Sequence, residues 1–378
     1  MRHSSTKLLI WLNLKTVKFV NPKITSNNFM NHNPEANLKP EQDQATQPLL
    51  NQSPTHNSQN NQNLVQAAQI LATLRTEISQ VIAGNQELID LMLIAIACRG
   101  HVLLEGMPGV AKTTLVKTVA QALGLNFKRI QFTPDLLPSD LIGTSIYNPK
   151  TLEFVIKPGP VFTNIVLADE INRAPAKVQS ALLECMQEQQ VTIGNESFKL
   201  DLPFLVFATQ NPIEQSGTYL LPEAQLDRFM FKLLVPYPNS EVEKQIITRS
   251  QQVIQTHAII SKPQLTLLQE LVDQVYVDEK IIEYIVKIVQ ATRNPAKFKL
   301  TIAGYIALGA SPRASLAIYH SAKAYALMHQ RQFVIPDDIK AVAPACLRHR
   351  IARSYEAQAN QISTDNIIAD LLEQIVTP

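Results

Sequence analysis

Hydrophobic and polar residues follow two different patterns along this chain, and the change falls near Pro238. Before that point, short apolar runs alternate with stretches of helical periodicity. The runs lie at 102–104, 127–132, 164–168 and 204–208, and Lys128, Arg129 and Gln131 interrupt the second of them. Continuous apolar runs of this length are typical of parallel strands that are buried on both faces. The first part of the chain therefore predicts an α/β fold, a parallel sheet with flanking helices.

The helical stretches of this part each have an apolar face. One covers 64–79, and a second covers 86–98 and stops before Gly100. A third has apolar residues at helical spacing, namely Val178, Ala181, Leu182, Cys185 and Met186. Two further segments predict β-hairpins: 137–160, which is punctuated by Pro and Gly, and 191–200, which turns at Gly194 and Asn195. The first is long enough to indicate a functional excursion.

After Pro238 the pattern predicts helices only. The candidates are 241–250, 263–275, 280–293, 312–329 and 337–347. Pro336 and the acidic pair behind it form a good helix start. The Arg348-His349-Arg350 triplet lies at a helix end, where positive charge complements the helix dipole, and this is a sufficient structural reason for it. We therefore do not expect His349 to be a metal ligand.

A glycine-containing loop follows the first apolar run and precedes a helix. Its residues are Gly106, Met107, Pro108, Gly109, Val110, Ala111, Lys112, Thr113 and Thr114. Such a loop wraps its backbone N–H groups around phosphate oxygens, and the helix adds its positive end. Lys112 can reach the β- and γ-phosphates, and Thr113 can place a hydroxyl on Mg²⁺. Ala111 replaces the usual second glycine, so we expect a backbone with φ below zero there.

The third run ends in two carboxylates, Asp169 and Glu170. In an open α/β sheet, ligands bind at the carboxyl ends of the strands. Asp169 would hold Mg²⁺, directly or through water, and Glu170 would deprotonate the attacking water. Hydrolysis of a phosphoanhydride is mostly positioning and charge stabilisation, so this pair and Lys112 provide the core chemistry.

Two more residues extend the candidate site. Asn211 follows the fourth run and has the donor and acceptor needed to hold a water, although an Asn-Pro pair is also an ordinary turn. Arg228 lies in an Asp-Arg pair after a short predicted helix at 222–229. It is either an arginine finger for a neighbouring subunit's phosphate or a member of a local surface ion pair.

Five segments of the chain, taken in order, resemble the MoxR family of AAA+ ATPases. They are Gly-Met-Pro-Gly-Val-Ala-Lys-Thr, Ala-Asp-Glu-Ile-Asn-Arg-Ala, Ala-Thr-Gln-Asn-Pro, Glu-Ala-Gln-Leu-Asp-Arg-Phe and Gly-Ala-Ser-Pro-Arg-Ala. The resemblance covers about residues 64–355, and Ala111 is itself usual in the family.

The resemblance implies roles for the matching residues. Lys112 and Thr113 match Walker A, Asp169 and Glu170 match Walker B, and Asn211 matches sensor 1. Arg228 matches the arginine finger and Arg313 matches sensor 2. The turn at 81–84 would lie against the adenine, and the excursion at 137–160 resembles an insert that commonly faces the ring centre.

At the level of the molecule, we expect three segments: a disordered Asn/Gln-rich tail over 1–62, an ATP-binding α/β domain over 63–237, and an all-α lid over 238–378. The resemblance implies that the lid covers the nucleotide and supplies Arg313. It further implies a hexameric ring that hydrolyses ATP with Mg²⁺. The ring would remodel or mature a client protein complex, by metal insertion among other routes, together with a von Willebrand factor A-type partner.

Two other classes of function stay open. A nucleic-acid motor related to helicases would need a basic, aromatic-interleaved surface in the hairpins, which offer only Lys150, Lys157 and Lys199. A nucleotide-gated binding scaffold with little turnover would not need Glu170 and Arg228. Both sequence features favour the ATPase.

Composition agrees with a cytoplasmic protein of about two domains. The chain has 378 residues, 46% of them hydrophobic, and no stretch of transmembrane length. Its three cysteines show no metal or disulfide spacing. The whole chain carries +2 and residues 1–34 carry +5, so the remainder carries −3, which argues against a nucleic-acid groove. The apolar stretch at 8–12 is short for a signal peptide, and Met30 is an alternative start.

Overall fold

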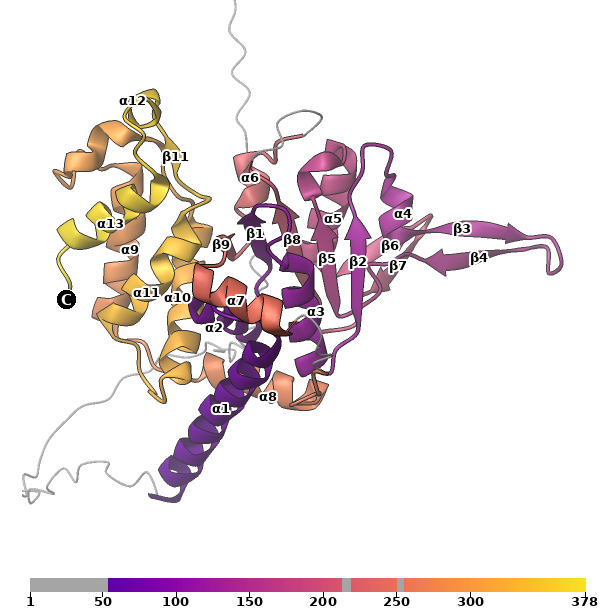
Figure 1. Ribbon diagram of the computed structural model, residues 1–378, viewed down its shortest axis with the longest axis horizontal. Helices are drawn as coiled ribbons and strands as arrows, with labels where there is room; N and C mark the ends of the chain where they lie inside the picture. Colours follow the sequence, from indigo (N-terminus) through magenta and orange to yellow (C-terminus); the bar gives the residue numbers. More distant parts are fainter. Residues whose placement is uncertain (1–53, 213–218, 250–254) are drawn as a thin grey trace, which may run out of the picture. The chain divides into compact units, whose positions relative to one another are not determined.

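The computed structural model describes residues 54–212, 219–249 and 255–378. A five-stranded parallel sheet organises the first part (Figure 1). Its strands are β1 (Val102–Gly106), β2 (Phe127–Gln131), β5 (Ile165–Asp169), β8 (Leu205–Gln210) and β9 (Phe231–Val235). They lie in the order β2-β5-β8-β1-β9. Because all are parallel, their carboxyl ends meet at one edge of the sheet.

Alternate residues of the strands enter two separate cores. Leu104 and Leu167 join one hydrophobic cluster, whereas their neighbours Leu103 and Val166 join the other. Three helices contribute to the first cluster, α1 (Pro54–Val81), α2 (Gln86–Ala97) and α3 (Lys112–Ala122). On the other face, α5 (Ala176–Glu188) buries its apolar side. The apolar runs of β1, β5 and β8 are therefore strands covered on both faces, as the sequence predicts, whereas the edge strand β2 is largely exposed.

Two hairpins leave the sheet region at the predicted places. The strands β3 (Gly143–Asn148) and β4 (Glu153–Pro158) follow the short helix α4 (Pro138–Ile142) and extend away from the body (Figure 1). The strands β6 (Gln190–Ile193) and β7 (Glu196–Lys199) turn at Gly194, whose φ is 63°.

The C-terminal part is mainly helical. Its helices are α7 (Ser240–Arg249), α8 (Lys262–Asp273), α9 (Glu279–Arg293), α10 (Pro312–Met328), α11 (Pro336–Leu347), α12 (Tyr355–Ala359) and α13 (Thr364–Gln374). Apolar residues of α8 to α11 and α13 join the cluster that α1 and α2 form. No described helix is long and apolar enough to cross a membrane.

The structure differs from the sequence predictions at several elements. Strand β9 was not predicted, and neither were α12, α13 and the small antiparallel pair β10 (Ile306–Leu308) and β11 (Ala352–Arg353), so the C-terminal part is not helical throughout. Helix α1 begins at Pro54, ten residues before the predicted start. The rest of the predicted 1–62 tail lies outside the described residues, and the division at 237/238 stays a prediction.

Candidate active site

The glycine-containing loop connects β1 to α3 at the carboxyl edge of the sheet. Gly106 closely approaches β9, since a Cβ there would lie 2.5 Å from the Val235 carbonyl oxygen. Gly109 has a φ of 84° and open space beside it. Ala111 has a φ of 58° and a ψ of 26°, so the expectation of a negative φ is wrong. The left-handed conformation of Ala111 lets the chain turn directly into α3, which begins at Lys112.

Lys112 lies across the ends of two neighbouring strands. Its ammonium donates hydrogen bonds to the carbonyl of Gly106 and, at 3.4 Å, to that of Gln210. These carbonyls end β1 and β8. Thr113 follows in the first turn of α3 and is half-buried. Both side chains therefore stand where the loop would hold phosphate.

Asp169 ends β5 with a side chain that is only 11% exposed. Its carboxylate accepts a hydrogen bond from the hydroxyl of Thr209 at 2.5 Å. It also accepts from the Arg129 guanidinium, whose Nε and terminal nitrogen lie 2.9 and 2.6 Å away. A carboxylate and a hydroxyl are hard-oxygen ligands of the kind Mg²⁺ prefers, so Asp169 and Thr113 are the residues that would hold it.

Glu170 is held on several sides. Its backbone has a φ of 56°, and its N–H donates to the Thr209 hydroxyl at 2.8 Å. Its carboxylate accepts from the amide of Gln131 at 2.8 Å and from the guanidinium of Arg173 at 2.9 Å. Gln131 also accepts from Arg129 at 2.8 Å. One polar network therefore orients both acidic residues.

Sequence reasoning missed the partners in this network, Arg129, Gln131, Arg173 and Thr209. Arg129 and Gln131 interrupt the apolar pattern of 127–132, and two polar residues at alternate positions of a strand share a face. That alternation could have indicated them, once β2 was known to pair with β5.

Asn211 directly follows β8 and is 8% exposed. Strand β8 lies between β5 and β1. Asn211 therefore lies between the strand that ends in Asp169 and the strand that leads to Lys112. Lys112, Thr113, Asp169, Glu170 and Asn211 all gather at the carboxyl edge, as the sequence predicts.

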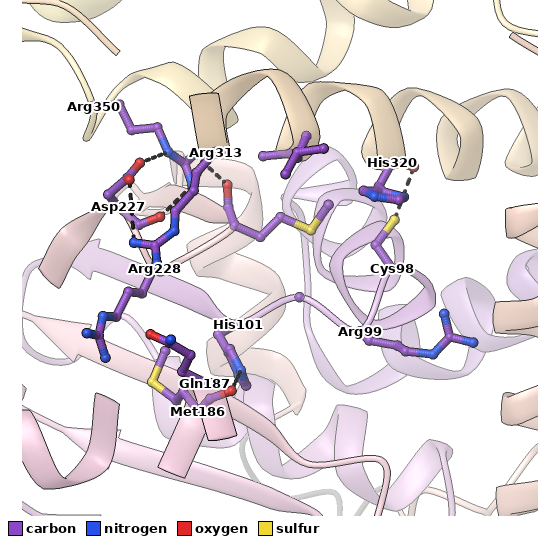
Figure 2. A pocket seen from close by; sticks show the side chains of 14 residues that line it. Cys98, Arg99, His101, Met186, Gln187, Asp227, Arg228, Arg313, His320 and Arg350 are labelled. Carbon is purple, nitrogen blue, oxygen red and sulfur yellow. Dashed lines mark hydrogen bonds and ion pairs between the residues drawn. The ribbon is translucent and has the colours of Figure 1, made fainter. Parts of the chain in front are cut away.

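The two candidate arginines lie at the opposite edge. Arg228 precedes β9, after the short helix α6 (Glu223–Leu226), and donates to the Leu183 carbonyl at 3.0 Å. Two residues later, Met230 donates its N–H to the carbonyl of His101, just before β1. Arg313, in the first turn of α10, is half-exposed and lies near Arg228 (Figure 2). Both line a cavity of about 270 Å³.

The length of β1 separates these arginines from the phosphate loop. Five residues of strand span about 16 Å. Arg313 therefore does not lie near the phosphate loop of its own chain, and its role at a nucleotide stays a prediction. The cause of this placement is Asp227, whose carboxylate accepts from Ser311 at 2.7 Å and lies 3.7 Å from Arg313, which ties the start of α10 to the loop before β9.

Arg228 is not paired with its neighbour Asp227, so the alternative of a local ion pair is wrong. Asp227 instead accepts from Arg350 at 2.8 Å (Figure 2). Arg350 is buried, and its guanidinium donates to the Cys346 carbonyl in the last turn of α11, as expected for a basic residue at a helix end. Its other bonds go to the loop before β9, which the sequence does not predict. His349 is also buried and bonds the carbonyl of Phe229 at 3.0 Å. Sequence reasoning could not find this link, since most of the acceptors are backbone carbonyls.

His101 joins three elements beside this cavity. Its Nδ1 accepts from the Val206 N–H of β8 at 3.0 Å, so its Nε2 carries the proton and donates to the Met186 carbonyl of α5 at 3.2 Å. Burial lowers the pKa of His101 to about 4, and the bond to Met186 opposes this only in part. The ring is therefore neutral and fixes α5 against the start of β1.

Comparisons with known proteins agree with this geometry. Residues 101–231 match the family described as ATPase family associated with various cellular activities, and residues 299–371 match the AAA lid domain. The chain is 49% identical to Chaperone MoxR1 of Mycobacterium tuberculosis over 80% of this chain and 81% of that protein.

More distant and structural relatives point the same way. Protein MoxR of Methylorubrum extorquens is 30% identical over 81% of this chain and 95% of its own. A crystal structure of a Cytophaga hutchinsonii protein, 47% identical, matches with a TM-score of 0.81 over 86% of this chain and 99% of that one. With a nucleotide-binding α/β domain, a lid domain and these relatives, the chain belongs to the MoxR family of AAA+ ATPases.

Proposed function

We propose that this protein hydrolyses ATP to ADP and phosphate with Mg²⁺, and that it does so as a ring, most simply a hexamer. The loop from Gly106 to Thr114 holds the phosphates through its N–H groups, and Lys112 neutralises the β- and γ-phosphate charge. Thr113 and Asp169 hold Mg²⁺, which would stabilise the charge that develops on the phosphate oxygens.

Glu170 acts as the general base. It is within reach of the carboxyl edge where the water must stand, and Gln131 and Arg173 keep its carboxylate in place. Asn211 orients the same water through its amide. Charge stabilisation of the leaving and attacking oxygens completes the chemistry, and an arginine near the γ-phosphate supplies much of it.

One observation supports the ring: the two candidate arginines of a chain lie far from that chain's own phosphate loop. Arg228 and Arg313 lie at the sheet edge opposite Lys112, Asp169 and Glu170. Head-to-tail contacts in a closed ring join two different surfaces of neighbouring subunits, so the amino edge of one subunit can face the carboxyl edge of the next. Arg228 and Arg313 would then serve the neighbour's nucleotide.

A protein client fits the surface better than a nucleic acid. The β3–β4 hairpin exposes apolar side chains, among them Tyr147, Leu152 and Phe154, the last two 73% exposed. A nucleic-acid motor would need a basic surface there. One relative is named a chaperone. We therefore extend the proposal to remodelling or maturation of a client complex in the cytoplasm, including metal insertion, together with a von Willebrand factor A-type partner.

Mixing two variants of low activity tests the shared site. Arg228→Ala and Glu170→Gln chains are each expected to keep only a small residual ATPase rate alone. When they are co-assembled, interfaces that join an intact Glu170 to an intact Arg228 should recover part of the wild-type ATPase rate. Activity per subunit should also rise steeply with protein concentration. Turnover that is independent of concentration, with no recovery in the mixture, would mean that one chain holds the complete site.

A further inference from the structure

Arg350 is the most fully bonded side chain at the junction of lid and ATPase domain. It follows α11, and its side chain is 2% exposed. Its Nε donates to the Asp227 carboxylate, and its other N–H groups donate to the carbonyls of Asp227, Phe229, Met230 and Cys346. A guanidinium has five N–H donors, so each of them is used.

The two residues before Arg350 bind the same peptide. Arg348 donates to the carbonyl of Lys232 at 2.7 Å. Burial lowers the pKa of His349 well below its usual value, so the ring is neutral and its Nε2–H donates to the Phe229 carbonyl. The triplet 348–350 therefore binds the 227–232 segment at four carbonyls, those of Asp227, Phe229, Met230 and Lys232, and Arg228 lies inside that segment.

Asp227 extends this link to the second arginine. Its side chain is 15% exposed and lies between Arg350 on one side and the start of α10 on the other (Figure 2). Ser311, which accepts from the N–H of Arg313 at 3.1 Å, donates to Asp227. One buried carboxylate thus joins Arg350 to the backbone that carries Arg313.

We infer that Arg350 is a positioning residue for ATP hydrolysis, which acts through Asp227 to hold Arg228 and Arg313 at a fixed spacing toward the next subunit. This rests on the proposed function, in which those two arginines reach the neighbour's phosphates. A guanidinium that binds the peptide on both sides of Arg228 leaves that arginine little freedom to shift. A misplacement of about 1 Å costs up to about 100-fold in rate, so the spacing matters for turnover.

The test compares Arg350→Lys with a matched lid variant, Arg331→Lys. A lysine keeps the charge but has three donors and no fork, so it cannot span these acceptors. Arg331 likewise pairs with a buried carboxylate, that of Asp338, which among the described residues makes no hydrogen bond or ion pair with the 227–230 loop. Steady-state ATPase rates, melting temperatures and binding of a fluorescent ATP analogue are measured for both.

Arg350→Lys should lower kcat by about 10- to 100-fold, with KM and binding of the analogue changed by less than about twofold. Arg331→Lys should lower the melting temperature with kcat unchanged. Asp227→Asn, which keeps the carbonyl acceptors of Arg350, should also lower kcat. If Arg350→Lys does not fold, Asp227→Asn provides the test instead.

A second background separates positioning from folding. In a chain that already lacks both Arg228 and Arg313, Arg350→Lys and Asp227→Asn should change the residual rate by less than about twofold, because residues that act as a unit are not additive. Three results would overturn the inference. The first is a full loss of rate in the background that lacks Arg228 and Arg313. The others are a wild-type kcat in both Arg350→Lys and Asp227→Asn, or a loss of kcat in Arg331→Lys equal to that in Arg350→Lys. If Arg228→Ala and Glu170→Gln still rescue each other, only the inference fails; if they do not, the proposed function fails.

Discussion

Glu170 shows how much of the chemistry depends on a single side chain. Glu170→Gln keeps the size of the group and its acceptor oxygen, so ATP binding should persist. An amide cannot take the proton of water, so turnover should fall by at least about 10²-fold. Equilibrium binding of ATP and phosphate release would be measured in parallel. Lys112→Ala, as a control, should weaken binding itself; a Glu170→Gln protein that hydrolyses ATP at the wild-type rate would remove Glu170 from its role.

Ala111 carries backbone strain in the phosphate loop. The left-handed backbone of a non-glycine residue such as Ala111 costs about 1–2 kcal/mol of folding free energy. Glycine would remove this cost, but its greater backbone entropy in the unfolded chain would offset part of the gain. Ala111→Gly should therefore stabilise the fold by up to about 1 kcal/mol, whereas the β-branched Ala111→Val should destabilise it. Urea unfolding measures both. A valine variant as stable as the wild type would show that the loop does not require this conformation.

At the scale of elements, His101 makes stability depend on pH. Its folded pKa of about 4 lies below the ordinary value of 6.5, so the unfolded chain binds more protons between these values. The contribution of His101 to the free energy of unfolding should therefore be fully present above pH 6.5 and be lost as the pH drops toward 4. His349, also buried, acts in the same direction.

His101→Gln isolates this contribution. A glutamine can accept from Val206 and donate to Met186, and it does not titrate. The difference in melting temperature between pH 7 and pH 5 should be smaller in the variant than in the wild type. An equal difference in both proteins would show that His101 does not titrate in the way its burial predicts.

The elements that could be predicted are those whose signal lies within a few neighbouring residues. Apolar runs predict β1, β5 and β8 because both faces of these strands are buried, and Gly194-Asn195 predicts the β6–β7 hairpin. Strand β9 is harder to see, since Lys232 interrupts it and pairs with Glu105 of β1. The position of α10 depends on Asp227 and on the partners of Arg350, which no local pattern shows.

At the scale of the whole molecule, the sheet separates two groups of candidate site residues: those at its carboxyl edge, and Arg228 with Arg313 at the opposite edge. Lys112, Asp169 and Glu170 could be identified from their motifs because a parallel sheet brings the carboxyl ends of its strands together. The placement of Arg313 could not, since it depends on contacts between residues about 85 positions apart. The central claim is therefore that each ATP is hydrolysed between two chains.

The most direct measurement is an electron cryomicroscopy structure of the Glu170→Gln protein with ATP and Mg²⁺. The account predicts a closed ring in which the γ-phosphate bound by Lys112 of one subunit lies within hydrogen-bonding distance of Arg228 from the next, with Arg313 beside it. A nucleotide contacted by Arg228 of its own chain, or a fully bound nucleotide with neither arginine near its γ-phosphate, would contradict it.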